Sequence, residues 1–341
     1  MAVIGTLLSL LVFFALFGIF LTQYVPVWMT DNEAEFTAEA QASFAQLKSA
    51  MDSQYVLNGP QSYGTPVVIS SDGIPLLAQP TQGTLEFLPQ NCPAPASASY
   101  TYPNGFYTSN AHGVNATNLG QPVDPEACTF ANITESIGPG GSHAYSQAIQ
   151  TGVLEFYLPN RYYQTQTLYL EDDAVVQSQG SGLSVMQIPP PLNVTVQGGN
   201  TTIWASQLQL YGNASTVIGT GTEQVYTHLR YTQLVSSNGK LSGTGLYTPF
   251  TFTFEIGTQF PCAWGAFLNN LFWNASGLPS TSFSLLSGLY PGTSVHYFTT
   301  QGTSCTNTDG ATQVLRAIVS NVNFAQVYVA GIQMGIGVGA T

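Results

Sequence analysis

The first 28 residues constrain the fold of this chain more than any other stretch. Residues 1–28 form an almost unbroken apolar block, and no Lys, Arg, Asp or Glu occurs before Asp31. As an α-helix rising about 1.5 Å per residue, this segment reaches roughly 40 Å, which exceeds the hydrocarbon core of a membrane, about 30 Å. No other part of the sequence is comparably apolar. The sequence therefore predicts one apolar N-terminal helix attached to a large polar remainder.

Three roles are open for such a helix. A secretory signal peptide carries a basic segment and a small-residue cleavage site, and this block has neither. A plain transmembrane anchor usually has Lys or Arg on its cytoplasmic side, and none flanks the block. The third role is a helix that a membrane holds before assembly and that packs against copies of itself afterwards.

The next segment, 31–55, is amphipathic. Its apolar residues recur at spacings of three and four, which places them on one face of a helix; they are Phe36, Ala40, Phe44, Leu47, Met51 and Tyr55. Thr30 and Glu33 are spaced as a capping box, which predicts a new helix start after Pro26. The alternative is one long helix, kinked at Pro26.

Four acidic residues begin this second segment, and we expect them to form a solvated face near a helix N-terminus, where negative charge is favourable. They are Asp31, Glu33, Glu35 and Glu39.

The start of the chain resembles a known family. The run Val3-Ile4-Gly5-Thr6-Leu7-Leu8, followed by a long apolar helix, is similar to the start of mature archaeal type IV pilins, which are relatives of bacterial type IV pilins and archaellins. The resemblance implies a leader removed just before Met1 by a prepilin peptidase, and assembly by a pilus ATPase and its platform. It also implies a filament core, for which we expect Val3, Ile4, Leu7, Leu8, Leu11, Phe14, Phe17 and Leu21.

One family feature does not carry over. Bacterial pilins place a Glu at the fifth mature position to pair with a neighbour's N-terminal amine, and this chain has Gly5. Assembly would then rest on apolar packing alone. A second, weaker resemblance spans 152–230, where the order of strand-like runs is similar to the β-rich heads of large archaeal pilin-like surface proteins. Together the two resemblances cover about a third of the chain.

Few ionisable residues occur after the apolar block. Charged residues make up 6% of the chain, with 5 Lys and Arg against 17 Asp and Glu, for a net charge of −12. Nucleic acid is excluded as an expected partner, because no basic patch exists to neutralise phosphates. A head with so few charges changes little between neutral and acidic medium, so we hypothesise that the protein works in acid.

Beyond Tyr55, the helical period gives way to strict alternation, as in 250–256, which predicts half-buried strands. The other expected strands are 65–70, 84–88, 152–158, 165–170, 193–197, 201–210, 225–231, 295–300, 323–329 and 332–338. Helices are expected only at 265–274 and 311–321, and 89–146 is expected as a long surface loop.

The predicted fold class is therefore α+β. A long hydrophobic helix, kinked near Pro26, spans 1–56 (apolar 1–28, amphipathic 31–55), and a large, mostly antiparallel β-sandwich-like head spans 57–341. A division of the head into two lobes near 216–222 is a further hypothesis.

The four cysteines lack the spacing of a zinc, redox or haem site. In an exported chain an even number suggests disulfides, and sequential pairing joins Cys92 to Cys128 and Cys262 to Cys305. Other pairings, and free buried thiols, remain open.

Six Asn-x-Ser/Thr sequons occur where chance predicts about four. If the head faces outside, several should carry glycans that shield a surface poor in charge; the candidates are Asn115, Asn132, Asn193, Asn200, Asn213 and Asn274.

Known catalytic and cofactor motifs are missing from the sequence. The four histidines are scattered, and His228 is expected to be simply exposed on the polar side of its strand. Glu171-Asp172-Asp173 has the oxygen ligands for a cation, although a solvated turn between two strands is the favoured interpretation. We therefore expect no enzyme activity, no cofactor and no metal site.

The preferred function is a structural subunit of an archaeal type IV pilus-like filament. The chain would form a homopolymer through helix 1–56, with a glycosylated, adhesive head outside the cell and a membrane-anchored precursor. Two alternatives remain: a membrane-anchored surface binding protein that never polymerises, and an exported hydrolase with an unrecognised site.

Overall fold

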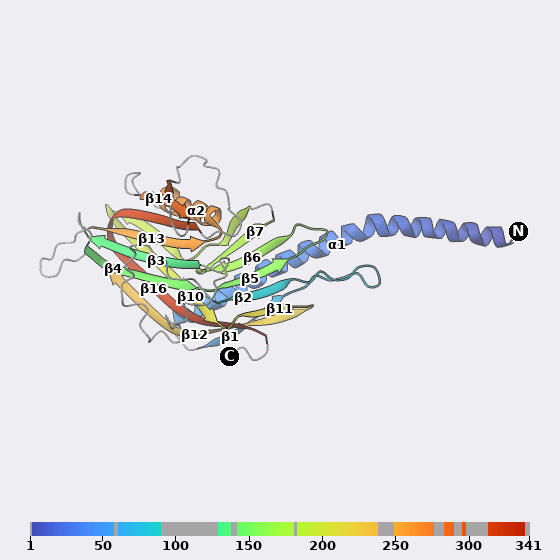
Figure 1. The fold of residues 1–341 in the computed structure, drawn as a ribbon, viewed down its shortest axis with the longest axis horizontal. Coiled ribbons are helices and arrows are strands. Elements are labelled where there is room, and N and C mark those ends of the chain that lie inside the picture. The colour runs from blue at the N-terminus through green and yellow to red at the C-terminus, as the bar shows by residue number, and fades with distance from the viewer. Residues whose placement is uncertain are drawn as a thin grey trace.

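The computed structural model describes residues 2–57, 61–89, 129–137, 142–180, 183–237, 249–275, 283–289, 295–297 and 313–337. Figure 1 shows a β-rich head from which a single long helix projects, with the N-terminus at its far end. This helix, α1 (Ala2–Leu57), is 56 residues long. Its second half lies within the head, and its first half stands free of it. The predicted α+β fold, a long apolar helix followed by a β-rich region, is confirmed.

Helix α1 passes through Pro26 without interruption. The predicted new start at Thr30 is therefore wrong, and the alternative of one long helix holds. Instead of capping a helix, the Thr30 hydroxyl donates to the carbonyl of Pro26 at 2.8 Å, one turn earlier. Pro26 itself has no N–H to donate, so the backbone carbonyl four residues before Pro26 lacks its usual helical hydrogen bond. The axis of α1 changes direction where the helix leaves the head (Figure 1), as expected for a helix that contains a proline.

The head contains two sheets. The ten-stranded sheet consists of β1 (Ser62–Val68), β3 (Thr129–Ile137), β4 (Ser142–Thr151), β9 (Leu192–Gln197), β10 (Asn200–Gly212), β12 (Thr222–Ser237), β13 (Phe250–Thr258), β14 (Phe283–Leu289), β15 (Val295–Tyr297) and β16 (Gln313–Ile336). The six-stranded sheet consists of β2 (Thr84–Leu88), β5 (Val153–Leu158), β6 (Gln166–Glu171), β7 (Ala174–Gln179), β8 (Ser184–Ile188) and β11 (Ser215–Ile218). Among the described strands, every pair is antiparallel except β10 with β16.

Strand β16 is the central element of the larger sheet. Its first half pairs with β13 and β14, and its second half pairs with β12 and β10. Asn321 separates the halves with a φ of 61°, a left-handed conformation that Asn tolerates better than most residues. The helix predicted over 311–321 is thus wrong for its described part. The alternate residues Leu315, Ala317 and Val319 are buried, which is the period of a strand.

The amphipathic half of α1 is a core element. Its predicted stripe from Phe36 to Met51 is completely buried, and Tyr55 packs at its edge, in a cluster that takes residues from both sheets. Phe156 of β5 holds two of these residues, because its ring meets Phe36 edge-on at 6.0 Å and stacks on Phe44 at 6.1 Å. The helix is therefore bound to the head by the same burial that stabilises the head.

A second core lies under α2 (Pro261–Asn269) and a following π-helical turn (Asn270–Ala275). This confirms the helix predicted at 265–274, which begins four residues earlier, and Trp264 of α2 is the largest fully buried side chain. The segment 216–222 was the hypothesised boundary between two lobes, and both cores contain residues from before and after it. The predicted loop 89–146 is wrong at its C-terminal end, since it includes β3 and the start of β4.

Phe156→Ala is expected to destabilise the head by about 3–5 kcal/mol, because it leaves a cavity between α1 and the sheet. The adjacent Tyr157 is 41% exposed, so Tyr157→Ala should cost less than about 1 kcal/mol and serves as the control. Urea denaturation of the detergent-solubilised chain, followed by tryptophan fluorescence, measures both. Equal losses from the two variants would contradict the packing described.

Candidate functional site

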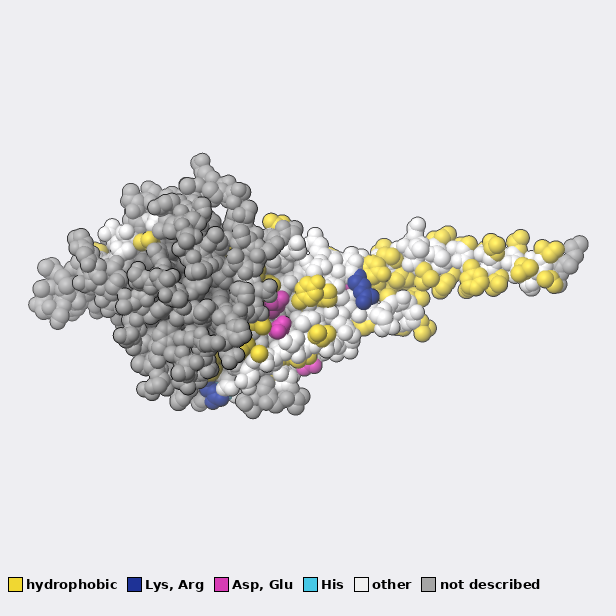
Figure 2. All heavy atoms as spheres, viewed as in Figure 1, with side chains coloured by type: hydrophobic (Ala, Val, Ile, Leu, Met, Phe, Trp, Pro, Cys, Tyr) yellow, Lys and Arg dark blue, Asp and Glu magenta, His cyan; other side chains and the backbone are white. Residues whose placement is uncertain are grey.

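The projecting half of α1 is an exposed apolar surface. The eight residues predicted as a filament core, from Val3 to Leu21, are between 36% and 70% exposed. On the face seen in Figure 2, apolar side chains follow the described length of the projection. Among the described residues, α1 is the one helix long and apolar enough to cross a membrane, with a mean hydropathy of 2.6 over its most apolar 18 residues and none of them buried. Isolated soluble proteins rarely expose an apolar surface of this extent, and such surfaces are typical of sites that contact a protein or a membrane.

The two threonines of the projection bond back onto the helix. Thr6 donates to the carbonyl of Val3 and Thr22 to that of Gly18, both at 2.9 Å. A hydroxyl satisfied in this way enters an apolar environment at low cost. The projection is thus suited to hydrocarbon or to packing against other helices.

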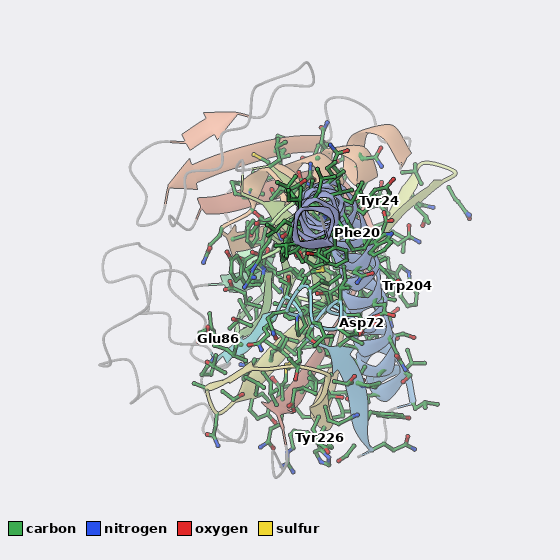
Figure 3. All side chains as sticks on the ribbon, turned by 90° about the vertical axis from the view of Figure 1, so that its right-hand side faces the viewer. Phe20, Tyr24, Asp72, Glu86, Trp204 and Tyr226 are labelled. Atoms are coloured by element: carbon green, nitrogen blue, oxygen red, sulfur yellow. The ribbon has the colours of Figure 1, made fainter. Side chains whose placement is uncertain are left out.

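An aromatic group marks the place where the projection meets the head. Phe20 stacks on Tyr24 at 5.8 Å and meets Trp28 edge-on at 5.5 Å, and Figure 3 shows Phe20 and Tyr24 on the helix viewed from its apolar end. Val25 and Met29 are already buried. Tyr and Trp at the end of an apolar span are typical of a membrane–water boundary.

Glu33 is the first anchor of α1 and is completely buried. Its Oε1 accepts hydrogen bonds from the Thr81 hydroxyl at 2.6 Å and from the backbone N–H of Arg161 at 3.0 Å. Its Oε2 accepts from the backbone N–H groups of Tyr162 at 2.6 Å and Tyr163 at 2.8 Å. Three successive N–H groups form a concave anion site of the kind called a nest.

The acidic face predicted for this region is therefore corrected. Asp31, Glu35 and Glu39 are exposed as expected, but Glu33 points inward. Burial raises the pKa of Glu33, yet the hydrogen bonds from Thr81, Arg161, Tyr162 and Tyr163 outweigh burial, so the pKa lies below its ordinary value.

The segment between β5 and β6 holds α1 on either side of Glu33. One turn before it, the Thr30 hydroxyl reaches the carbonyl of Tyr162 at 3.5 Å. One turn after it, the Asn160 amide donates to the Thr37 hydroxyl at 3.1 Å. Residues four and three apart share a helix face, so one segment grips two turns of the helix.

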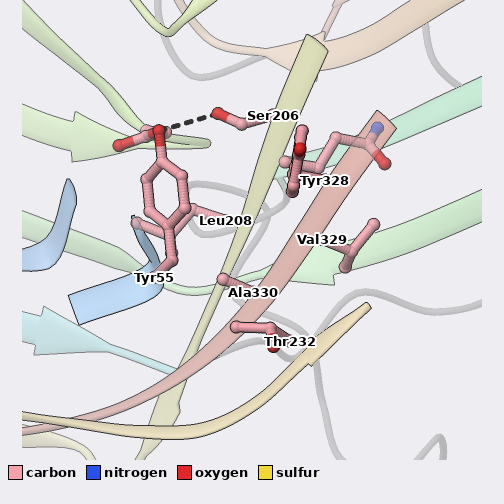
Figure 4. A pocket seen from close by; sticks show the side chains of 9 residues that line it. Tyr55, Ser206, Leu208, Thr232, Tyr328, Val329 and Ala330 are labelled. Atoms are coloured by element: carbon pink, nitrogen blue, oxygen red, sulfur yellow. Dashed lines mark hydrogen bonds between the residues drawn. The ribbon is translucent and has the colours of Figure 1, made fainter. Parts of the chain in front are cut away.

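Lys48 is the second anchor. Its ammonium group lies 2.9 Å from the carboxylate of Asp52 on the same helix and 3.1 Å from that of Asp173 in the head. Ser206 donates to Asp173 at 3.0 Å, and Tyr55 from the end of α1 points to the same place (Figure 4). The Lys48–Asp173 pair is almost completely buried, so loss of Lys48 leaves the Asp173 carboxylate buried without a charge partner, whereas Lys48 without Asp173 still has Asp52.

The acidic run 171–173 forms the turn between β6 and β7, and the prediction that this turn is solvated is wrong. All three residues are 1% exposed, and Asp172 and Asp173 have φ values of 40° and 64°, which close a two-residue hairpin. Glu171 accepts from the Thr258 hydroxyl at 2.7 Å and from the Trp264 indole N–H at 2.6 Å. Within the described part of the chain, no group of three or more His, Cys, Asp or Glu residues is arranged to hold a metal ion.

Groups outside β9 complete the hydrogen bonding of β10. Beyond Ala205, β10 has no β9 residue opposite it. The backbone N–H of Ser206 donates to the carbonyl of Pro191, and that of Leu210 to the Thr151 hydroxyl. One backbone carbonyl and one side-chain hydroxyl thus take the place of a neighbouring strand for these two N–H groups. The two oxygens of the buried Asp172 carboxyl, in contrast, have no hydrogen-bond partner among the described residues.

Burial raises the pKa of the carboxyl groups of Glu171, Asp172 and Asp173. That of Glu171 rises to about 7, although Thr258 and Trp264 oppose the change. That of Asp173 also rises to about 7, with Lys48 opposing. The pKa of Asp172 rises well above its ordinary value through burial and the two acidic neighbours.

His228 has a partner that the sequence did not indicate. Its Nδ1 lies 2.6 Å from the Ser62 hydroxyl, in an open hollow that Arg230 also lines. Burial, and then Arg230, lowers the pKa of His228. No carboxylate is among the described residues that line this hollow, so a Ser–His–acid arrangement is not assembled there.

The remaining predicted sites are only partly described. Cys262 is disulfide-bonded, and its partner lies outside the described residues, as do Cys92, Cys128, Cys305 and Asn115. Among the sequons, Asn193, Asn200 and Asn213 are exposed. The backbones of Asn132 and Asn274 belong to β3 and the π-helical turn, and their side chains lie outside the description.

Glu33→Gln is expected to cost roughly 2–4 kcal/mol near pH 7, because a neutral amide replaces a carboxylate that accepts four hydrogen bonds. A carboxyl whose folded pKa is lowered stabilises fully above its unfolded pKa, and this contribution disappears as the pH falls through the folded pKa. The difference between the variant and the unaltered chain should therefore shrink in acid. Urea denaturation across pH measures it, with exposed Glu35→Gln as the control, and an unchanged stability near pH 7 would refute the anchor.

Glu171→Gln tests the buried acidic turn. A carboxyl whose folded pKa is raised to about 7 leaves the fold most stable below the unfolded pKa, and stability falls as the pH rises through 7. The fall attributable to Glu171 is on the order of 3 kcal/mol, and the variant should lose that part of the pH dependence. Denaturation midpoints between about pH 4 and pH 8 measure this. A pH profile identical to that of the unaltered chain would contradict it.

Comparison with protein-family models, with curated proteins and with solved structures finds no match to this chain. The resemblance to archaeal type IV pilins therefore stays a prediction from the residues that carry it.

Proposed function

We propose that this chain is the structural subunit of an extracellular pilus-like filament, which polymerises through the projecting half of α1. One observation carries the proposal. The apolar residues from Val3 to Leu21 are exposed, yet they continue without a break into a helix whose other half is core. A helix built in this way gives many copies a common apolar axis and fixes one head to each.

The anchors support a mechanical role. Glu33 and Lys48 lie about four turns apart on α1, and each is bound to a different part of the head. The Phe36–Met51 stripe between them is buried against both sheets. Pulling on the projection therefore loads the core of the head rather than a flexible linker.

The free energy of burying the projection favours two stages, with the projection in a membrane first and in a filament afterwards. Removing roughly 2,000 Å² of apolar surface from water is worth tens of kcal/mol at about 25 cal/mol per Å², so the projection cannot remain in water. Before assembly a membrane would hold it, with Tyr24 and Trp28 at the boundary. Transfer from lipid into a helix bundle gains far less, because acyl chains are equally apolar. Extraction would require an assembly ATPase outside this chain.

A second apolar feature lies on the same side of the head. The excursion at residues 70–82 projects alongside α1 in Figure 1, and the Asn32 amide donates to the carbonyl of Asp72 at 3.1 Å, which ties it to the helix. Leu76 at its tip is fully exposed with a φ of 66°. In a filament this tip would face a neighbouring subunit.

A membrane-anchored surface protein that never polymerises is the second candidate. The aromatic group at Phe20, Tyr24 and Trp28 favours it, since such a group suits a permanent membrane boundary as well as a temporary one. The two candidates differ in whether the projections of separate copies ever meet.

Leu11→Lys distinguishes them. A Lys in the middle of a membrane helix costs about 2.5–3.5 kcal/mol, and each copy would bring one charge into the filament axis. We expect filaments to fall at least about tenfold relative to the membrane-held pool, while the head stays resistant to proteolysis. Electron microscopy of fibres sheared from cells, with N-terminal sequencing of their subunit, measures the yield.

The matched control is Ile218→Lys, the same kind of change on an exposed residue of the head. It should leave filament yield unchanged. Normal filaments from Leu11→Lys, or an unaltered chain found only as single particles in detergent, would overturn the proposal.

A further inference from the structure

Strand β9 is an edge strand that carries a sequon on its exposed side. Among the described strands it pairs with β10 alone. Leu192 and Val194 are buried, whereas Asn193 and Thr195 between and after them are exposed. Both residues that a glycosyltransferase must recognise therefore face solvent on an accessible edge.

Directly across from this sequon stands an exposed tryptophan. In the antiparallel register Asn193 pairs with Trp204 of β10, and Thr195 pairs with Thr202. Side chains opposite each other in such a pair lie on the same face, with Cβ atoms about 5 Å apart. Trp204 is 44% exposed, and its ring stacks on Tyr328 of β16 at 6.1 Å with an interplanar angle of 22°. Two strands thus present a supported aromatic surface beside the Asn193 amide.

We propose that Asn193 carries an N-linked glycan whose first sugar packs on Trp204. The C–H groups of a pyranose face are weakly positive and apolar, and an indole face is negative and apolar, so the two attract and exclude water. The proposal rests on the proposed exposure of the head outside the cell. It adds to that proposal one specific site and the chemical class of its ligand.

The chemistry is a transfer from a diphosphate-linked sugar donor by a separate transferase. The Asn193 Nδ2 bonds to C1 of the sugar as the C1–O bond to the diphosphate breaks. One amide proton is lost to solvent, and the diphosphate leaves with the electron pair of the broken bond. No oxidant or reductant is required.

The position gives the glycan a structural effect. An edge strand with free backbone groups invites pairing with another sheet. A sugar packed on Trp204 would cover both the indole and the outer side of β9. Heads crowded along a filament would then meet through sugar rather than through strand edges.

Asn200 is a matched control within the same hairpin. It is an exposed sequon residue at the end of the Gly198–Gly199 turn, and its cross-strand partner is Gln197 rather than an aromatic residue. A glycan there should gain nothing from Trp204.

The experiment uses the full chain purified from its own cells. Peptide mass spectrometry reads occupancy at Asn193, and thermal unfolding compares Asn193→Gln, Trp204→Ala, the double variant and Asn200→Gln with and without Trp204→Ala. We expect an occupied Asn193 and a loss of about 2 °C or more from Asn193→Gln. Trp204→Ala should lower the unfolding temperature clearly less when Asn193 is already replaced by Gln than in the unaltered chain. Replacing Asn200 by Gln should not change the effect of Trp204→Ala on the unfolding temperature.

An unmodified Asn193 would overturn the site. An occupied Asn193 with equal Trp204→Ala losses in both backgrounds would overturn the packing. Either result is separable from failure of the proposed function, because filament formation is scored independently by microscopy.

Discussion

The burial of one face of α1 against both sheets is the constraint on which the rest of the molecule depends. The helix has two halves with opposite requirements: an apolar half that is exposed and has no packing partner among the described residues, and a striped half that completes one of the two cores. Since both belong to one continuous helix, the head cannot form this core without also fixing the direction of the projection. Glu33 and Lys48 hold the register along the helix, because each has its partners at one place in the head.

Although the chain has few charged residues, several of them are buried in the head. The Glu33 carboxylate is stabilised by backbone N–H groups, and the Asp173 carboxylate by Lys48, whereas Glu171 rests on two neutral donors. The pH dependence of stability that Glu33 produces is opposite in sign to the one that Glu171 produces. Acid weakens the Glu33 anchor and relieves the cost of ionising the buried turn, so the head has no single direction of pH sensitivity. The hypothesis that the protein works in acid is compatible with this balance and stays a hypothesis.

Local patterns were reliable wherever burial follows a simple period. The stripe from Phe36 to Met51 predicted the buried helix face, and alternation in 84–88 predicted β2. The patterns were wrong where short runs are ambiguous. The run 311–321 was assigned to a helix although it begins β16, and 323–329 and 332–338 were separated although β16 continues through both to Ile336. Pairing with four partner strands, which local sequence does not reveal, keeps that strand continuous.

The sequence alone determined that this chain has one apolar helix, a striped continuation and a β-rich remainder, because these depend on composition and on periods of a few residues. Only the tertiary structure decided which charges are buried. Glu33 is one of four similar acids in sequence, and what singles it out is a run of N–H groups roughly 130 residues away in the chain. The buried turn at 171–173 and the pairing of Asn193 with Trp204 are of the same kind. Each depends on which distant segments meet, and that depends on how the two sheets enclose the helix.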